Sequence, residues 1–348
     1  MSRTPEVLTE RHLNRALLAR QLLLERASGS LPKILERIGG IQAQYTPSTY
    51  LGLWTRIEGF ESRQLERALE RRTVVQGTLM RVTIHLVSAR DWWPFAVAVR
   101  EARRRALVRA QKLDERRLAA AARKIQERIA GDTMTQAEMR KLLGETTGLS
   151  SAVWLDLVRV PPSGTWARRR ADIYAAAEDW LDDDGARIDP NEAVDHLVRS
   201  CLRGFGPAGR ADIADWAGLP VRDVAASLGR LELRRFRDER GNELVDLPRA
   251  PLPDPDTPAP VRLLPVWDAT TLKSMRRTGV LPDQHRPRFT KSPYPHSMNA
   301  FLVDGRVAGV WNIKDGRVQF DPFEKIDRAA MRELREEGER LAAFYTET

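Results

Sequence analysis

The sequence predicts a mainly α-helical α+β fold with β wings, in which three tandem winged-helix units precede a small C-terminal β-rich domain. Two observations lead to this prediction. Groups of amphipathic helical segments are each followed by an alternating, turn-containing segment, and this order recurs at a spacing of roughly 80 residues. Beyond residue 260 the pattern changes to short apolar runs separated by Asp-Gly, a strong hairpin signal.

The first unit is expected over residues 1–89. Apolar residues at helical spacing predict helices at 13–27, 31–38 and 62–71, the last with Ser62 as its N-cap. The β-branched, alternating segment 73–87, with Gly77 in its middle, predicts a hairpin that forms the wing.

The second and third units repeat this order. Residues 90–185 predict helices at 90–112, 114–130 and 135–143, the last capped by Thr133 or Thr135, and then an extended segment at 153–166 around a Pro-Pro-Ser-Gly turn. Residues 186–247 predict helices at 191–203, 210–217 and 220–231, followed by a wing whose strands meet across the turn 240–242.

A proline-rich linker separates these units from the C-terminal domain. Residues 248–260 contain six prolines, a composition typical of a stiff, extended segment. Residues 261–348 then predict strands at 261–267, 300–303, 307–313 and 318–320 and a closing helix at 326–344.

The charge points to an anionic partner. The chain of 348 residues has a formal net charge of +9 and an isoelectric point near 10. Residues 100–128 alone carry eleven Lys or Arg against four Asp or Glu, which predicts contact with phosphates, although a solvated helix face would show the same pattern. The lone Cys201, the lack of a signal pattern and the lack of a long apolar run predict a cytoplasmic, nucleoid-associated protein with no membrane contact.

Two motifs suggest chemistry that their context does not support. Residues 204–209 match the glycine fingerprint of dinucleotide-binding proteins, but a helix precedes them where that fingerprint needs a strand, so we expect a helix-to-helix turn. Residues 182–184 are three aspartates in a polar stretch and predict a solvated loop. The His residues have no metal-ligand spacing, so the sequence predicts no metal and no cofactor.

Gln42 and Gln44 stand two residues apart after a Gly-Gly break. Carboxamides can hold a water or a base edge, although spacing alone favours a polar turn at a helix end. Arg81, Thr83 and His85 alternate in the first wing and would share one strand face, which could line a polar cleft, although spacing alone favours an ordinary solvent face.

The third unit carries a basic helix and wing. In the DNA-binding interpretation, the helix at 220–230 is a recognition helix, and a protein-binding module remains the alternative. The arginines of this surface are Arg222, Arg230, Arg234, Arg235 and Arg237.

Five segments together resemble the AlkZ/YcaQ family of winged-helix DNA glycosylases. They are Gly40-Ile-Gln-Ala-Gln44 with Tyr45-Thr-Pro-Ser, the segment 77–87, Arg159-Val-Pro-Pro-Ser-Gly-Thr-Trp166, Leu264-Pro-Val-Trp-Asp268 and the segment 302–311. They occur in the order of the family and span nearly the whole chain.

The resemblance implies a concave DNA-binding surface and the excision of alkylated purines, including N7-alkylguanines made by DNA-crosslinking natural products. Gln42 and Gln44 match the Gln-x-Gln motif of the AlkZ-like branch, so we expect Gln44 to orient a water and Gln42 to support it. Ser163, Thr165 and Trp166 of one turn and the hairpin at Asp304-Gly305 are candidates for DNA contact.

The sequence therefore predicts a monomeric, monofunctional DNA glycosylase that needs no cofactor and no protein partner and acts on double-stranded DNA with alkylated purines. A winged-helix transcriptional regulator and a family member that only binds lesions stay open as alternatives.

Overall fold

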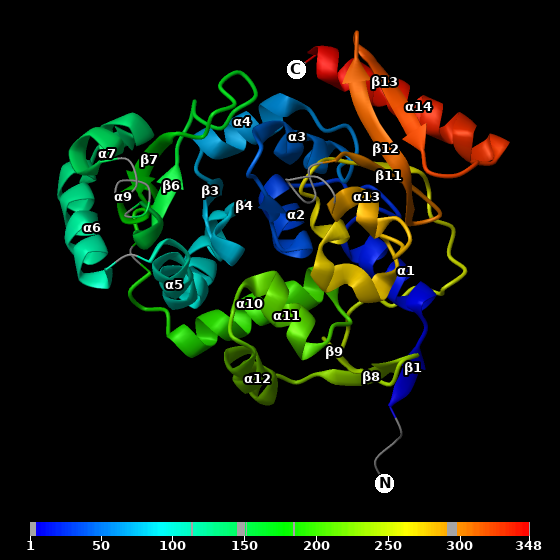
Figure 1. Cartoon of the computed structure of the whole chain (residues 1–348), viewed down its shortest axis with the longest axis horizontal. Coiled ribbons are helices and arrows are strands. Elements are labelled where there is room, and N and C mark those ends of the chain that lie inside the picture. The colour runs from blue at the N-terminus through cyan, green and yellow to red at the C-terminus, as the bar shows by residue number, and fades with distance from the viewer. Residues whose placement is uncertain are drawn as a thin grey trace.

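The computed structural model describes residues 5–112, 114–144, 150, 152–183, 185–290 and 298–347. Its described elements form three β-sheets with helices packed around them (Figure 1). The mixed α+β class expected from the sequence is confirmed.

The first part of the chain contains the expected helices and hairpin, together with one helix that the sequence pattern does not reveal. Its elements are β1 (Glu6–Leu8), α1 (Glu10–Arg20), α2 (Leu31–Ile38), β2 (Ile41–Gln42), α3 (Thr46–Trp54), α4 (Ser62–Glu70), β3 (Val74–Thr78), the 3-10 turn η1 (Met80–Val82) and β4 (Ile84–Ser88). All residues of α3 are buried, so this helix has no apolar stripe on a polar background.

Two local predictions for this part were wrong. The helix expected at 13–27 ends at Arg20. The N-cap of α4 is Glu61 rather than Ser62, and the Glu61 backbone N–H donates to the Gln64 side chain at 3.2 Å.

The middle of the chain follows the expected order closely. Its elements are α5 (Ala89–Gln111), α6 (Glu115–Ile129), β5 (Thr133–Thr135), α7 (Gln136–Leu143), β6 (Leu157–Arg159), β7 (Ile173–Ala176) and α9 (Ala177–Leu181). Thr135 caps α7, since its hydroxyl accepts from the Glu138 N–H at 3.2 Å. Of the segment expected to be extended, only β6 is a strand.

The next part contains three helices and a hairpin, as expected. They are α10 (Pro190–Phe205), α11 (Arg210–Ala217), α12 (Val221–Arg230), β8 (Arg234–Asp238) and β9 (Glu243–Asp246). Residues 206–209 connect α10 to α11, which confirms that the glycine-rich segment is a helix-to-helix turn.

The C-terminal part contains the expected strands and closing helix. Its elements are β10 (Arg262–Leu264), η2 (Ala269–Thr271), η3 (Lys273–Thr278), α13 (Arg286–Thr290), β11 (Ala300–Val303), β12 (Arg306–Lys314), β13 (Arg317–Pro322) and α14 (Arg328–Glu347). Both Asp-Gly pairs form the hairpin turns. Asp304 and Asp315 have φ of 46° and 52°, the left-handed region that two-residue hairpin turns require.

The sheets connect parts of the chain that the sequence pattern separates. One sheet has the order β2-β4-β3-β6-β7-β5, because β3 pairs with β6 across the boundary expected at residue 89. A second sheet has the order β1-β8-β9, with β1 parallel to β8, and the third has the order β10-β11-β12-β13. The segments expected as the first two wings therefore contribute strands to one sheet, and β2 lies at its edge.

Gly77 lies inside β3 rather than at the hairpin turn, which spans Leu79–Thr83. A Cβ atom at residue 77 would lie 2.1 Å from the Trp92 ring and 3.0 Å from the Leu157 carbonyl oxygen. The glycine is needed because a buried indole and the neighbouring strand both approach the backbone at this point.

We therefore expect Gly77→Ala to lower the free energy of unfolding by about 1–3 kcal/mol or more, because the added methyl overfills a packed core. Denaturant unfolding measures the change. Gly229→Ala is the matched control, since residue 229 is inside α12 and a Cβ there meets nothing within 4 Å. The control should stabilise the protein by about 0.5–1 kcal/mol. Unchanged stability of Gly77→Ala would contradict the close approach of Trp92.

Candidate active site

Gln42 and Gln44 lie where helix α2 gives way to the edge strand β2. Gly39 and Gly40, with φ of 79° and 80°, end the helix and reverse the chain direction. A Cβ at residue 40 would lie 2.9 Å from the Val87 side chain and 3.0 Å from the Leu86 carbonyl oxygen. The two glycines thus allow β2 to approach and pair with β4.

The two glutamines are held differently. Gln42 is 6% exposed, and its Oε1 accepts a hydrogen bond from Arg81 Nη2 at 3.1 Å. Gln44 is exposed, and its Oε1 accepts from the backbone N–H of Ile84 at 3.2 Å. Both carboxamides are therefore fixed through their oxygens to the hairpin β3–β4.

Arg81 reaches the site from the hairpin turn, not from a strand face. It lies in η1 with φ of 54°, so the alternation expected for Arg81, Thr83 and His85 was wrong at its first member. The long side chain nevertheless brings its guanidinium to Gln42, and Nη2 also lies 3.4 Å from His85 Nε2. Nη1 donates to the Trp216 carbonyl oxygen at the end of α11, and desolvation lowers the pKa of Arg81 to about 10.

His85 is a neutral support beneath Gln42. It is 3% exposed, and its Nδ1 lies 3.0 Å from the Thr83 carbonyl oxygen, an acceptor that places the proton on Nδ1. The Nε2 lone pair then faces Arg81. Burial first, and the Arg81 charge second, lower the pKa of His85 to about 3. Thr83 turns its hydroxyl to the Met80 carbonyl oxygen at 3.0 Å, so it supports the turn.

The low pKa of His85 predicts an acid-sensitive fold. The unfolded chain binds a proton near the ordinary value of 6.5 and the folded chain only near 3, so the unfolded state binds more protons between these values. We expect the free energy of unfolding to be fully present above pH 6.5 and to fall as the pH decreases towards 3. Unfolding of wild type and His85→Asn at pH 7.5 and pH 5 measures this, and the variant should lose less stability. Equal losses would contradict the assignment.

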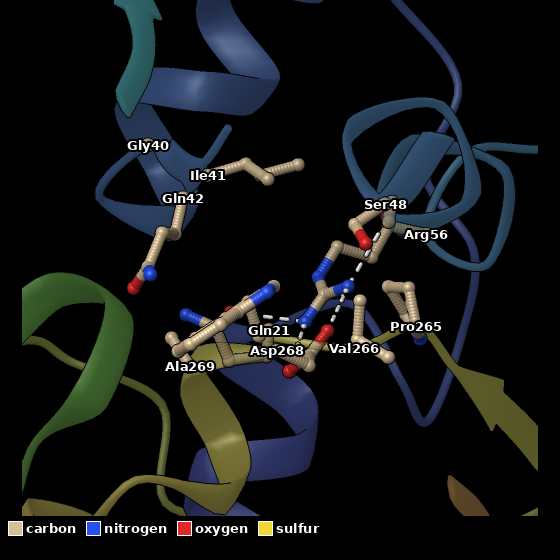
Figure 2. A pocket seen from close by; sticks show the side chains of 12 residues that line it. Gln21, Gly40, Ile41, Gln42, Ser48, Arg56, Pro265, Val266, Asp268 and Ala269 are labelled. Carbon is tan, nitrogen blue, oxygen red and sulfur yellow. Dashed lines mark hydrogen bonds and ion pairs between the residues drawn. The ribbon is translucent and has the colours of Figure 1, made fainter. Parts of the chain in front are cut away.

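A small pocket lies beside Gln42 (Figure 2). Gln42 stands on one side of it and the ion pair of Arg56 with Asp268 on another, with Arg56 Nη1 and Asp268 Oδ2 2.9 Å apart. The cavity, of about 10 Å³, has room for a single water molecule. The Ser48 hydroxyl and Arg56 Nε are buried at this pocket without a hydrogen-bond partner among the described residues.

Asp268 is the carboxylate of this pocket, and its oxygens are already bound by Arg56 and Thr270. Burial acts to raise the pKa of Asp268, but Arg56 and Thr270 outweigh it and hold the pKa below its ordinary value. The carboxylate also accepts from the Thr270 N–H at 3.0 Å and the Thr270 hydroxyl at 2.7 Å. Asp268 therefore anchors the C-terminal part to Arg56, just after the end of α3, and is not free to act as a base.

Ser163, Thr165 and Trp166 are buried at 2%, 6% and 8% exposure. The Ser163 hydroxyl accepts from Asp172 N–H at 2.6 Å and donates to the Arg170 carbonyl oxygen, and the Thr165 hydroxyl donates to the Pro162 carbonyl oxygen. Trp166 packs against Tyr50 and Tyr345. In the structure these three side chains build the turn and do not face outward.

The same turn carries exposed groups that the sequence pattern did not single out. Arg169 is exposed and stacks over the Trp166 ring at 4.8 Å. Tyr45, the residue after Gln44, is 48% exposed. The Thr46 hydroxyl donates to the Arg169 carbonyl oxygen at 2.5 Å, which joins the turn to the start of α3. The signal in the sequence was an aromatic residue directly after the Gln pair.

The arginines of the third unit are engaged within the chain. Arg230 pairs with Asp195 at 2.6 Å, Arg234 with Asp246 at 3.2 Å, and Arg235 with Glu243. Arg222 lies 3.2 Å from Asp223 and is 77% exposed, and Arg237 donates to the Gly241 carbonyl oxygen. The structure places Arg222 and Arg235 outward and Arg234 against its own hairpin.

The hairpin at Asp304-Gly305 packs on α1. The Asp304 carboxylate pairs with Arg11 at 2.8 Å and also with Arg15, and Asn14 donates to the Gly305 carbonyl oxygen at 2.9 Å. The turn is therefore fixed against α1 with its carboxylate paired, while the Asp304 side chain stays 52% exposed, and its place in DNA contact stays a prediction.

Part of the basic stretch 100–128 also faces inward. Arg100 and Arg103 pair with Asp156 at 2.8 and 2.6 Å, and Arg104 lies over the Trp154 ring. The exposed cations of this stretch are Arg105, Arg109, Lys112, Arg116, Arg117, Arg123, Lys124 and Arg128, the last of which lies 3.6 Å from Asp132.

Other classes of site find no support in the described residues. Within them, no group of three His, Cys, Asp or Glu side chains could hold a metal ion. Asp182 and Asp183 follow α9, and Asp184 lies outside the described residues. No helix that the structure describes is long and apolar enough to cross a membrane.

Comparisons with known proteins find relatives in both sequence and overall fold. The chain is 21% identical over 355 residues to an interstrand DNA cross-link repair glycosylase of Streptomyces sahachiroi, an alignment that covers 93% of each chain. Its fold is similar to the solved structure of the DNA glycosylase AlkZ from the same organism, with a TM-score of 0.80 and 18% identity over 97% of this chain and 96% of that one.

The family model for AlkZ-like DNA glycosylases matches residues 35–344, a range that begins before the Gln pair and ends within α14. Since this range includes most of the chain, the protein belongs to the AlkZ-like family of DNA glycosylases and is an enzyme that acts on DNA.

Proposed function

We propose that this chain is a monofunctional glycosylase that hydrolyses the N-glycosidic bond of N7-alkylated, cationic guanines in duplex DNA, including interstrand cross-links. The observation that carries the proposal is that the described residues of the site offer no free carboxylate and no charged imidazole. Two carboxamides line the site, His85 is uncharged at neutral pH, and the nearby Asp268 is locked to Arg56.

A site without a free acid suits a substrate that already carries a positive charge. Alkylation at N7 makes the guanine a cation and therefore a good leaving group, so no strong acid is needed to protonate it. The enzyme has to position a water at C1′ and stabilise the separating charges, and positioning of this kind contributes on the order of 7–11 kcal/mol. Unalkylated purines lack this activation and are left intact.

In the proposed reaction, the oxygen of a water forms a bond to C1′ while the C1′–N9 bond breaks. The electron pair of that bond moves into the purinium ring, which leaves as a neutral alkylguanine, and a proton passes to solvent. Gln44 orients the water, and Gln42 supports the water or the sugar.

Exposed cations supply DNA binding. The exposed Lys and Arg residues of α5 and α6 suit phosphate contact, as do Arg222 and Arg235. A cross-linked guanine cannot rotate fully into a deep pocket, and the Gln42 cavity of about 10 Å³ is far too small for a base. We therefore propose that the protein works as a monomer on a lesion that stays close to the duplex. The name of the Streptomyces relative supports the cross-link part of this proposal.

The test is release of free base. The protein is incubated with duplex containing N7-methylguanine and with duplex containing an N7-guanine cross-link, and the free base and abasic sites are measured. We expect release from at least the monoadduct and none from undamaged duplex. Tight lesion binding without release would favour a protein that only binds lesions, and no release from any alkylated duplex would overturn the proposal.

A further inference from the structure

The orientation of the Gln42 carboxamide is decided by its partner. Its Oε1 lies 3.1 Å from Arg81 Nη2, and a guanidinium can only donate. The side-chain oxygen must therefore point to Arg81, because the reverse orientation would bring two donors together. The same reasoning applies to Gln44, whose Oε1 faces the backbone N–H of Ile84, which is also an obligate donor.

With both carboxamide oxygens engaged, the side-chain amino groups of Gln42 and Gln44 remain available for hydrogen bonding. Among the described residues, neither Gln42 Nε2 nor Gln44 Nε2 has a hydrogen-bond partner in the protein. Gln42 is the last residue of β2, and Gln44 lies in the bend two residues further along the chain. For Gln42, which is 6% exposed and held by a cation, the amino group is the polar face that remains available.

Arg81 strengthens this donor. Hydrogen bonds to the Trp216 carbonyl oxygen and to Gln42 hold the guanidinium, and His85 Nε2 lies beside it at 3.4 Å. Within the described residues no carboxylate lies within ion-pairing distance of Arg81. Its charge therefore acts on the Gln42 carbonyl, and polarising an amide at its oxygen makes its N–H groups better donors.

A donor requires an acceptor on the substrate. An N7 substituent or cross-link fills the major groove, so the side of C1′ that stays open is the minor groove. There a purine offers the N3 lone pair, and guanine adds only a donor, its N2 amino group. Resting on the proposed function, we infer that the Gln42 amino group donates a hydrogen bond to N3 of the alkylated purine and that Arg81 is the positioning residue for this contact.

The hydrogen bond from Gln42 to N3 would be strongest in the transition state. As the C1′–N9 bond breaks, its electron pair enters the purine ring and raises the electron density at N3. A hydrogen bond to N3 therefore stabilises the transition state more than the bound substrate, which is the condition for accelerating the step. Gln44, which is exposed, keeps a second lone pair on its oxygen for the attacking water.

The test removes the acceptor from the substrate. Release of base is measured from duplex containing N7-methylguanine and from matched duplex containing N7-methyl-3-deazaguanine, in which C–H replaces N3. Each rate is divided by the rate of spontaneous depurination of the same duplex without protein. For wild type, we expect the normalised rate on the 3-deaza substrate to be roughly one tenth of the normalised rate on N7-methylguanine. This is the effect of losing one hydrogen bond worth about 1.4 kcal/mol.

Variants assign the contact to its residues. Gln42→Ala should release both bases at equal normalised rates, because its donor is gone. Arg81→Met should shrink the ratio between the substrates and Arg81→Lys should restore part of it, a readout that a merely structural role would not change. Gln44→Ala is the matched variant, since it should slow both substrates and keep their ratio.

The outcomes separate the two proposals. Equal normalised rates in wild type would overturn the N3 contact and leave the glycosylase proposal standing, and this comparison needs no variant. An unchanged ratio in Arg81→Met would overturn the role of Arg81. Failure of wild type to release either base would instead defeat the proposed function itself.

Discussion

Replacing Gln42 and Gln44 together with alanine is expected to reduce the rate of N7-methylguanine release by roughly 100- to 1000-fold, the cost typical of removing preorganised polar groups from an active site. The reason is structural. Arg81 and the backbone of Ile84 fix both carboxamides before any substrate arrives, so no reorganisation is needed during the reaction. Single-turnover release with excess protein measures the effect on the chemical step.

A matched control separates chemistry from folding. Gln284 is also exposed, and its Nε2 donates to the Glu324 carboxylate at 3.0 Å, far along the chain from the Gln pair. Gln284→Ala should keep the wild-type rate. Thermal unfolding of the double variant tests whether the protein stays folded without the two carboxamides. Equal release by wild type and a folded double variant would remove Gln42 and Gln44 from the active site.

The second large effect concerns stability. Asp246→Ala is expected to lower the free energy of unfolding by about 3–5 kcal/mol, because it leaves a buried charge without its partner. The Arg20 and Asp246 side chains are 1% and 0% exposed, and Arg20 Nη2 lies 2.8 Å from Asp246 Oδ2. This pair fastens helix α1 to strand β9 across most of the chain. Urea unfolding of the variant measures the loss.

The neighbouring pair on the same hairpin provides the control. Arg235 and Glu243 are 60% and 61% exposed, so Glu243→Ala should cost only about 0–1 kcal/mol. Similar losses in the two variants would show that Arg20 finds other partners or water when Asp246 is removed.

Local sequence signals identified most elements correctly. The amphipathic helices α2, α7 and α11 and the hairpin turns at Asp304 and Asp315 lie where the sequence predicts them. Such elements are specified by spacing and by residues that tolerate positive φ, which are properties of short stretches. Helix α3 was missed because it is buried on every side, and a helix of that kind shows no amphipathic period.

The residues of the site also fall into those that the sequence revealed and those that it did not. The Gln pair was found through its resemblance to a family motif, because Gln-x-Gln has no distinctive spacing of its own. The Arg81 contact was not predicted, since the alternation suggested a strand face that spacing alone assigned to solvent, and the structure has a left-handed turn at Arg81. Ser163, Thr165 and Trp166 belong to another of the five family-like segments, but their side chains make contacts within the protein.

The sequence by itself determined the α+β class, the order of helices and hairpins, the basic character and, through its motifs, the family and the two glutamines. Only the tertiary structure decided which arginines pair with internal carboxylates, that β3 and β4 share a sheet with β6 and β7, and that each glutamine oxygen accepts from the hairpin β3–β4. The physical reason is the distance along the chain over which each kind of signal acts. Spacing and turn residues act within a few positions, whereas the partners of Gln42 and Arg81 are brought together from residues 42, 81, 85 and 216 by packing alone.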